Sequence, residues 1–282
     1  MDRRLTPFRE DLAADWLVGQ VDATAFAAGK PFQVTASVAD VRRAPEPDAP
    51  LDTQALFGEI VTVYETTAEG WAWGQLGSDG YVGYISASAL SETSFEPTHW
   101  VNALWSFTYP EPNMKTQPVE QVPFGARVKV EEHLGDFCRL SNYRFIWARH
   151  LTPMGEILPG FVATCEHFLG TPYLWGGMSP WGFDCSGLVA TALRAAGHDA
   201  PRDSDMLEAD FGEDLGAFGE RDLQRGDLVY WKGHVGIMTD PETLLHCNGY
   251  HMSTVAEPLA GAVERIADLY ARPTTCRRPV AS

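Results

Sequence analysis

The chain has 282 residues, of which 45% are hydrophobic and 11% are aromatic. This length is enough for two or three domains with packed cores. The formal net charge of −17 argues against binding to nucleic acid or to an anionic membrane surface, because either partner would repel such a chain.

The N-terminal segment, residues 1–30, begins with charged residues and never develops the uninterrupted apolar core of a signal peptide. No later run approaches the length of a membrane span, so we expect a cytoplasmic protein. The cysteines are odd in number and include no C-x-x-C pair, which predicts reduced thiols rather than a disulfide framework or a zinc site. They are Cys138, Cys165, Cys185, Cys247 and Cys276.

Residues 31–95 contain short β-type runs such as "EIVTVYE" and "GYVGYIS", separated by turn residues, and predict an all-β domain. Residues 96–154 repeat its landmarks: a Pro-Glu-Pro element, a Phe-Gly pair and a closing strand, "YISASAL" in the first copy and "FIWARHL" in the second. Both copies resemble bacterial SH3-like barrels, modules that bind cell-wall peptides or pack on a catalytic partner. Only the first copy has the "SDGYVGY" turn with Tyr81 and Tyr84.

From residue 155 the pattern changes to a helical one, with Phe161, Cys165, Phe168 and Leu169 on one face, so Cys165 is expected in the core. The Gly-rich loop "TPYLWGGMSPWGFD", a second helix, an acidic segment and several strands follow. One helix region before an antiparallel sheet predicts an α+β domain over 155–282.

Cys185 is the first residue of the second predicted helix, whose apolar face recurs at helical spacing. Unpaired amides and the positive end of the helix dipole at this position favour a thiolate and, later, an oxyanion. The alternative is a small buried residue that only packs. The apolar face consists of Leu188, Val189, Ala192, Leu193 and Ala196.

His234 and His246 lie on either side of the turn at Asp240 and Pro241. If the hairpin centres on Asp240, the two histidines face each other on adjacent strands with Cβ atoms roughly 5 Å apart, and one holds the tautomer of the other. Two unrelated structural histidines are the alternative. The opposite face then carries Val235, Ile237, Leu245 and Cys247, which makes Cys247 a core residue.

Five blocks in a fixed order, "TPYLWGG", "FDCSGLV", "PRDSD", "RGDLVYWKGHVGIM" and "LLHCNG", resemble the NlpC-type, papain-like cysteine peptidases that cut bacterial cell-wall peptides. The resemblance implies a multidomain chain: two all-β SH3-like barrels followed by an α+β papain-like peptidase domain. It makes Cys185 the nucleophile, His234 the general base and His246 the residue that orients this base. It places Tyr173 beside the thiol, where it helps to position the thiol or the oxyanion.

The same resemblance assigns five positions to the substrate pocket. The alternatives are that Trp175 is a core residue and that Asp203 or Ser204 caps a helix that begins near Asp205. The five positions are Trp175, Asp184, Ser186, Asp203 and Ser204.

The domain order resembles the branch that cleaves γ-D-glutamyl-diaminopimelate bonds in released murein peptides with a free N-terminal L-alanine. In that branch the first barrel offers a tyrosine and an acid to the substrate ammonium group. Tyr81 is the candidate tyrosine, while the loop "RRAPEPDAPLDTQ" departs from the usual Ser-Glu and leaves Glu46, Asp48 or Asp52 as the acid. The expected partner is therefore a small murein peptide, without metal or cofactor. The alternatives are another papain-like amidase or acyltransferase, and a non-catalytic cell-wall peptide-binding protein.

Overall fold

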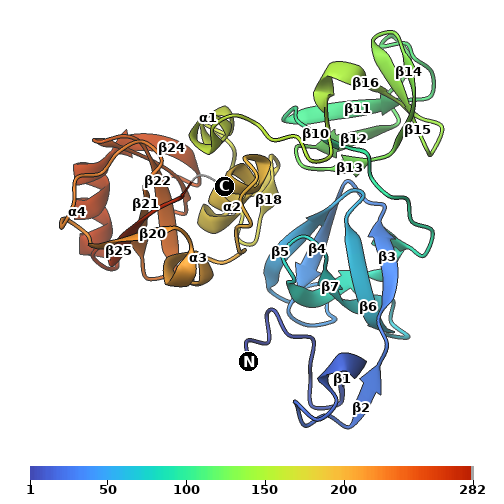
Figure 1. Ribbon diagram of the computed structural model, residues 1–282, viewed down its shortest axis with the longest axis horizontal. Coiled ribbons are helices and arrows are strands. Elements are labelled where there is room, and N and C mark those ends of the chain that lie inside the picture. Colours follow the sequence, from blue (N-terminus) through green and yellow to red (C-terminus); the bar gives the residue numbers. More distant parts are fainter. Residues whose placement is uncertain (281–282) are drawn as a thin grey trace. The chain divides into compact units, whose positions relative to one another are not determined.

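The computed structural model describes residues 1–280, and its chain divides into two compact units, with the division between Gly155 and Glu156 (Figure 1). Among the described residues, no helix is long and apolar enough to cross a membrane. The boundaries predicted for the four sequence segments stay a prediction.

The N-terminal segment is folded onto the first β-rich region. It contains β1 (Leu12–Ala14), the 3-10 turn η1 (Asp15–Leu17) and β2 (Ala25–Ala27). Arg9 attaches the segment, because its guanidinium lies 4.3 Å from the ring centroid of Trp73 and donates to Glu65 at 2.7 Å and to the Tyr84 hydroxyl at 2.9 Å. Tyr84 is thus engaged within this unit.

The first β-rich region forms a seven-stranded sheet in the order β5-β4-β8-β7-β6-β3-β9. Alternating side chains fill one apolar interior, which includes Val41, Val61 and Ile85. The strands are β3 (Lys30–Val34), β4 (Val38–Arg42), β5 (Leu51–Leu56), β6 (Ile60–Thr66), β7 (Trp71–Leu76), β8 (Val82–Ser86) and β9 (Leu90–Ser91), with the turn η2 (Ala87–Ala89) before β9.

The second β-rich region repeats these pairings, but its strands form two sheets, in the orders β13-β10-β17 and β12-β11-β16-β15-β14. β10 pairs with β13 and β17 as β3 pairs with β6 and β9, and each copy ends in a strand, a 3-10 turn and a short closing strand. The internal repeat is confirmed at this level. The elements are β10 (His99–Val101), β11 (Trp105–Tyr109), β12 (Glu120–Pro123), β13 (Arg127–Val128), β14 (Val130–Leu134), β15 (Phe137–Leu140), β16 (Phe145–Trp147), η3 (Ala148–His150) and β17 (Leu151–Pro153).

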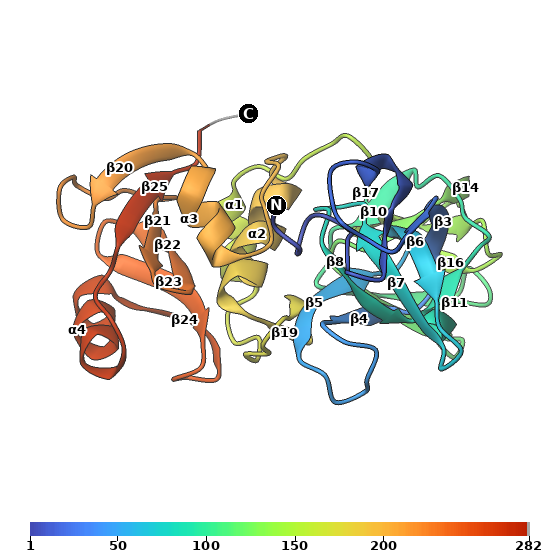
Figure 2. The same cartoon turned by 90° about the horizontal axis from the view of Figure 1, so that it is seen from below.

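The C-terminal unit is built on a six-stranded sheet in the order β20-β25-β21-β22-β23-β24. Helices cover both faces, with α1 and α2 on one side and α4 on the other (Figure 2). The strands are β18 (Met178–Ser179), β19 (Gly182–Phe183), β20 (Glu213–Ala217), β21 (Leu228–Trp231), β22 (His234–Asp240), β23 (Thr243–Asn248), β24 (Ser253–Pro258) and β25 (Thr275–Arg278). The helices are α1 (Phe161–His167), α2 (Cys185–Ala195), α3 (Ser204–Asp210) and α4 (Leu259–Leu269).

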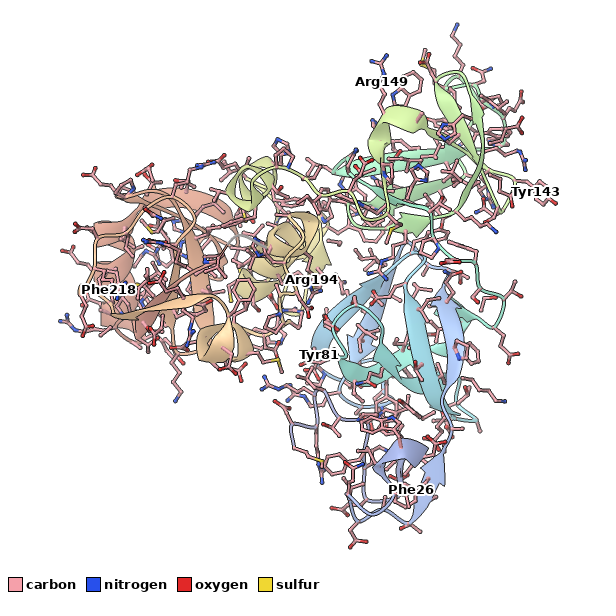
Figure 3. The ribbon with its side chains drawn as sticks, viewed as in Figure 1. Phe26, Tyr81, Tyr143, Arg149, Arg194 and Phe218 are labelled. Carbon is pink, nitrogen blue, oxygen red and sulfur yellow. The ribbon has the colours of Figure 1, made fainter. Side chains whose placement is uncertain are left out.

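Burial agrees with most of the predicted core. Cys165 and Cys247 are fully buried, as expected. Leu169 was expected on the buried face of the first helix, and this prediction is wrong. The helix α1 ends at His167, and Leu169 lies beyond its end with 49% of its surface exposed. Arg194, labelled in Figure 3, is the one residue of α2 that is not buried, so the helix is apolar on nearly all sides.

Gly58 lies where the two β-rich regions meet, and it has a left-handed backbone with φ of 80°. An added Cβ would lie 1.9 Å from the Arg127 carbonyl oxygen, while the Arg127 amide donates to the Phe57 carbonyl at 2.8 Å. Gly70 has the same kind of backbone, with φ of 86°, but open space around it.

We predict that Gly58→Ala lowers the free energy of unfolding by about 2–4 kcal/mol, because overpacking adds to left-handed strain. The control Gly70→Ala should lose only the strain, about 1–2 kcal/mol. Hydrogen exchange of the N-terminal unit in urea measures the loss of unfolding free energy in both variants. Equal losses would show that the Arg127 carbonyl moves away without cost.

Candidate active site

The position of Cys185 is set by its neighbour Asp184, the N-cap of α2. The Asp184 carboxylate accepts from the Gly187 amide at 2.7 Å and from the Gly176 amide at 2.9 Å, which ties the start of the helix to the Gly-rich loop. Gly187 is required here, since a Cβ would lie 2.2 Å from the Gly177 carbonyl oxygen. Cys185 is therefore held as the first residue of the helix.

Arg202 completes this anchor from the segment before α3. Its guanidinium is 1% exposed and donates to both Asp184 oxygens, at 3.1 and 2.7 Å, and to the Ser186 hydroxyl at 3.0 Å. Sequence reasoning did not identify Arg202 as a site residue, although it lies within the quoted block "PRDSD". The two-pronged guanidinium of Arg202 holds the Asp184 carboxylate in place and contacts no reacting atom.

The Cys185 thiol lies at the junction of α2 and β22. The residue is 8% exposed, and Sγ is 4.0 Å from the carbonyl oxygen of Gly233, the residue before His234. Burial, followed by the charge of Asp184, raises the pKa of the thiol to about 12, and the amides of Val235 and Ser186 act in the opposite direction. The Ser186 amide at the start of α2 thus favours the thiolate as expected, but burial outweighs it.

His234 and His246 are joined by a hydrogen bond of 2.9 Å between His234 Nε2 and His246 Nδ1. The sequence predicts that His234 and His246 face each other directly across the hairpin, and this prediction is wrong. Ile237 pairs with Leu245, and a bulge between Met238 and Asp240 shifts the hairpin, so the two histidines meet diagonally. Gly236 makes room for this contact, because a Cβ there would lie 3.2 Å from the Cβ of His246.

The surroundings of His234 keep its imidazole neutral. Burial, and then the neighbouring His246, lower its pKa to about 3, so the imidazole rests neutral. Its Nε2 is occupied by His246, which leaves Nδ1 as the nitrogen for the thiol. The thiol lies by the backbone of Gly233 and Val235, the two neighbours of His234, and a neutral thiol can react with a neutral imidazole by transferring its proton as sulfur attacks.

Tyr173 lies in the Gly-rich loop, where it forms a bridge to Phe183. Burial raises the pKa of its hydroxyl, and the nearby side chains of Cys185 and Asp184 raise it further. The hydroxyl therefore stays protonated and can donate a hydrogen bond close to the thiol. This is the chemistry required of a group that positions the thiol or an oxyanion.

Behind His246 lies a carboxylate that sequence reasoning missed. Glu257 of β24 accepts from His246 Nε2 at 2.7 Å and also pairs with Arg265 of α4. Its signal in the sequence is one charged residue in the strand "STVAEP", but the pairing with β23 that brings it to His246 is not visible there.

His246, His251 and Glu257 have ligand atoms within 4.8 Å of one another, so they are the residues that could hold a metal ion in the described chain. The fit is poor, because Arg265 contacts the Glu257 oxygen that a metal would need. A guanidinium at that place repels a cation.

The predicted substrate-pocket residues divide into two groups. Trp175 is 64% exposed and is therefore not a core residue. Asp184 and Ser186 are buried and bonded to each other and to Arg202, while Asp203 occupies the N-cap position of α3 without a side-chain cap bond and Ser204 begins that helix. Contact of any of them with a substrate stays a prediction.

In the N-terminal unit, the Tyr81 ring (Figure 3) belongs to the apolar cluster of the first β-rich region and is 3% exposed. Of the three candidate acids, Asp52 is paired with Arg43 at 2.6 Å, whereas Glu46 and Asp48 are exposed on the loop between β4 and β5. Recognition of a substrate by Tyr81 or Glu46 stays a prediction.

Arg202→Met should lower the free energy of unfolding of the C-terminal unit by about 3–5 kcal/mol, because it leaves the buried Asp184 carboxylate without its cation. The exposed pair Arg221–Glu213 supplies the control, and Arg221→Met should change the stability by about 1 kcal/mol or less. Urea unfolding followed by hydrogen exchange compares the two variants. A similar small loss in both would mean that Arg202 does not stabilise the head of α2.

Two family models match the chain. Residues 170–267 match the NlpC/P60 family, and residues 41–90 match the bacterial dipeptidyl-peptidase SH3 domain. A gamma-D-glutamyl-L-lysine dipeptidyl-peptidase of Bacillus subtilis is 28% identical over 225 residues, which cover 71% of this chain and 73% of that protein. The protein of the same name from Bacillus cereus is 28% identical over 254 residues, covering 77% and 74%.

A crystal structure of an NlpC/P60 family protein from Bacillus cereus has the same fold, with a TM-score of 0.73 at 22% identity, over 88% of this chain and 99% of that one. The fold class predicted from the sequence is confirmed: a β-rich SH3-like region followed by an α+β domain. Together with the cysteine at the head of α2 and its paired histidines, these matches identify the chain as an NlpC/P60 cysteine peptidase with an N-terminal bacterial SH3-like domain, homologous to the gamma-D-glutamyl-L-lysine dipeptidyl-peptidases.

Proposed function

We propose that the protein hydrolyses the bond between γ-D-glutamate and the following diamino acid in free murein peptides that carry an unblocked N-terminal L-alanine. The observation that carries the proposal is the hydrogen-bonded pair His234–His246 beside Cys185 in a chain aligned over most of its length with the gamma-D-glutamyl-L-lysine dipeptidyl-peptidases. The sequence predicts diaminopimelate as the diamino acid, whereas the names of these relatives specify lysine. A cytoplasmic location stays a prediction.

The reaction is acyl transfer to water. The thiol of Cys185 gives its proton to Nδ1 of His234 as sulfur attacks the γ-glutamyl carbonyl, and the oxyanion forms near the free amides at the start of α2. His234 then protonates the leaving amine of the diamino acid. Water, deprotonated by the same imidazole, attacks the thioester and releases L-Ala-D-Glu together with the restored thiol. Tyr173 is proposed to donate to the oxyanion.

The restriction to free peptides follows from charge. A carboxylate that meets a substrate ammonium group in a desolvated site loses its partner when the amine is acylated, and such a mismatch discriminates strongly between substrates. We propose Glu46 as this acid and Tyr81 as the tyrosine offered to the same ammonium group, although only 3% of Tyr81 is exposed. The support for Glu46 is that it is exposed, as is Asp48, while Asp52 is already paired with Arg43.

We expect the purified protein to split L-Ala-γ-D-Glu-meso-diaminopimelate into L-Ala-D-Glu and diaminopimelate, and Cys185→Ala to abolish the reaction. N-acetylation of the tripeptide should lower kcat/KM by at least about 100-fold, because the acid loses its ammonium partner. Chromatography of the products from free and acetylated peptides, each with diaminopimelate or lysine in third position, measures both preferences.

The four peptides separate the parts of the proposal. Equal cleavage of acetylated and free peptides would contradict amine recognition by Glu46 and Tyr81. Cleavage of neither would contradict the substrate class. In the variant Glu46→Gln, with Asp48→Asn as the matched control on the same loop, only the first should raise KM for the free peptide.

The pH dependence should follow from the lowered pKa of His234. A base with its pKa below the ordinary imidazole value stays unprotonated as the pH falls through about 6.5, so kcat/KM should remain nearly constant down to about pH 5. An ordinary imidazole with a pKa of about 6.5 would instead lose roughly 30-fold at about pH 5. Initial rates measured at low substrate concentration between about pH 5 and about pH 6.5 distinguish these two cases, and the larger loss would contradict a neutral His234.

A further inference from the structure

The hydrogen bond from His234 to His246 is followed by a second one on the far side of His246. His246 is fully buried, and its Nε2 lies 2.7 Å from the Oε1 atom of Glu257 on the neighbouring strand β24. Glu257 is opposite Leu244 in the register and lies two residues along β24 from Val255, the direct partner of His246, so the sheet places Glu257 diagonally across from His246. No part of the peptidase chemistry above uses this carboxylate.

The identity of each partner determines where the protons lie. A carboxylate only accepts, so the proton between Glu257 and His246 is on His246 Nε2. Neutral His246 then has a bare Nδ1, which can only accept, and the bond of 2.9 Å places the proton on His234 Nε2. Neutral His234 is left with a bare Nδ1. This is the tautomer that can take a proton from Cys185.

Glu257 is held in its ionised form by the groups around it. The hydrogen bond from His246 lowers the pKa of Glu257 most, and the positive charge of Arg265 adds to the effect. Arg265 contacts the same oxygen as His246 and is itself held over the Tyr250 ring, with its Cζ 4.4 Å from the ring centroid. His251 Nδ1 lies 3.9 Å from Glu257.

We propose that Glu257 is a positioning residue that fixes the tautomers of both histidines, so that the site works as a chain of four groups, Cys185, His234, His246 and Glu257. The proposal rests on Cys185 and His234 acting as nucleophile and base. Glu257 acts through His246 and touches neither substrate nor thiol. Its replacement should therefore lower kcat and leave KM nearly unchanged.

A purely structural function for Glu257 makes a different prediction. The carboxylate pairs with Arg265 and so attaches α4 to β24, and removing either partner would then weaken the fold equally. Arg265→Met tests this, because it breaks the ion pair and leaves the bond from His246 to Glu257 in place. The Cys185–His234 pair can therefore be tested separately from the attachment of α4.

Nitrogen-15 NMR of the histidine rings is the direct test, because it distinguishes protonated from bare ring nitrogens without any substrate. The signals are assigned from their loss in His234→Gln and His246→Gln. In the wild type and in Arg265→Met, both rings should carry the proton on Nε2. In Glu257→Leu, which removes the acceptor, the single tautomer should give way to a mixture.

Kinetics on the peptide substrate provides the second readout. Glu257→Leu should lower kcat on the order of 10- to 100-fold with KM changed less than about twofold. Glu257→Gln keeps an oxygen for His246 and should restore most of kcat, while Arg265→Met should lose stability but little kcat. Thermal unfolding shows that each variant is folded under the conditions of the assay.

The proposal is overturned if the wild type carries the proton on His246 Nδ1, or if folded Glu257→Leu keeps both tautomers and the wild-type kcat. Equal effects of Glu257→Leu and Arg265→Met on stability and kcat would indicate attachment of α4 alone. If no peptide is cleaved by the wild type, the proposed substrate fails, while the NMR result still decides the role of Glu257.

Discussion

The site depends on the Asp184 carboxylate, because this one group fixes where α2 begins. It binds the amide of Gly187 in the first turn, the amide of Gly176 in the Gly-rich loop and the guanidinium of Arg202. All three contacts converge on the residue before Cys185. A nucleophile at the first position of a helix is useful only if that position is rigid, and here the rigidity comes from a fully bonded buried acid rather than from the cysteine itself.

The position of the base, His234, relative to His246 depends on the register of a β-hairpin. The bulge between Met238 and Asp240 offsets the strands, and the missing side chain at Gly236 lets His246 reach His234 diagonally. Burial then has two consequences: it keeps the thiol and the imidazole neutral at rest, and it strengthens each hydrogen bond in the chain behind them. The reactive ion pair is therefore formed during attack on the peptide.

How much the sequence reveals depends on whether a feature is local. The ordered motifs indicated Cys185, His234 and His246 and the β-rich repeat, because a helix start and alternating strands leave local patterns. The prediction that His234 and His246 face each other directly was wrong, because the bulge between Met238 and Asp240 leaves no local pattern in the sequence. Arg202 and Glu257 were missed as site residues for a related reason: their meaning comes from partners far along the chain, which only the folded sheet and loop bring together.

The central claim, that Cys185 with its histidine chain carries the peptidase reaction, is tested most directly by alkylation of the native protein. All five cysteines are free and buried, and Cys138 also has a histidine partner, with its Sγ 3.3 Å from His133 Nδ1, so the labelling of Cys138 is the comparison for that of Cys185. Limiting iodoacetamide followed by peptide mass spectrometry should show label on Cys185 first, with hydrolysis of the tripeptide lost in proportion to that label. Full hydrolysis by protein whose Cys185 is alkylated, or loss that follows label on another cysteine, would contradict the account.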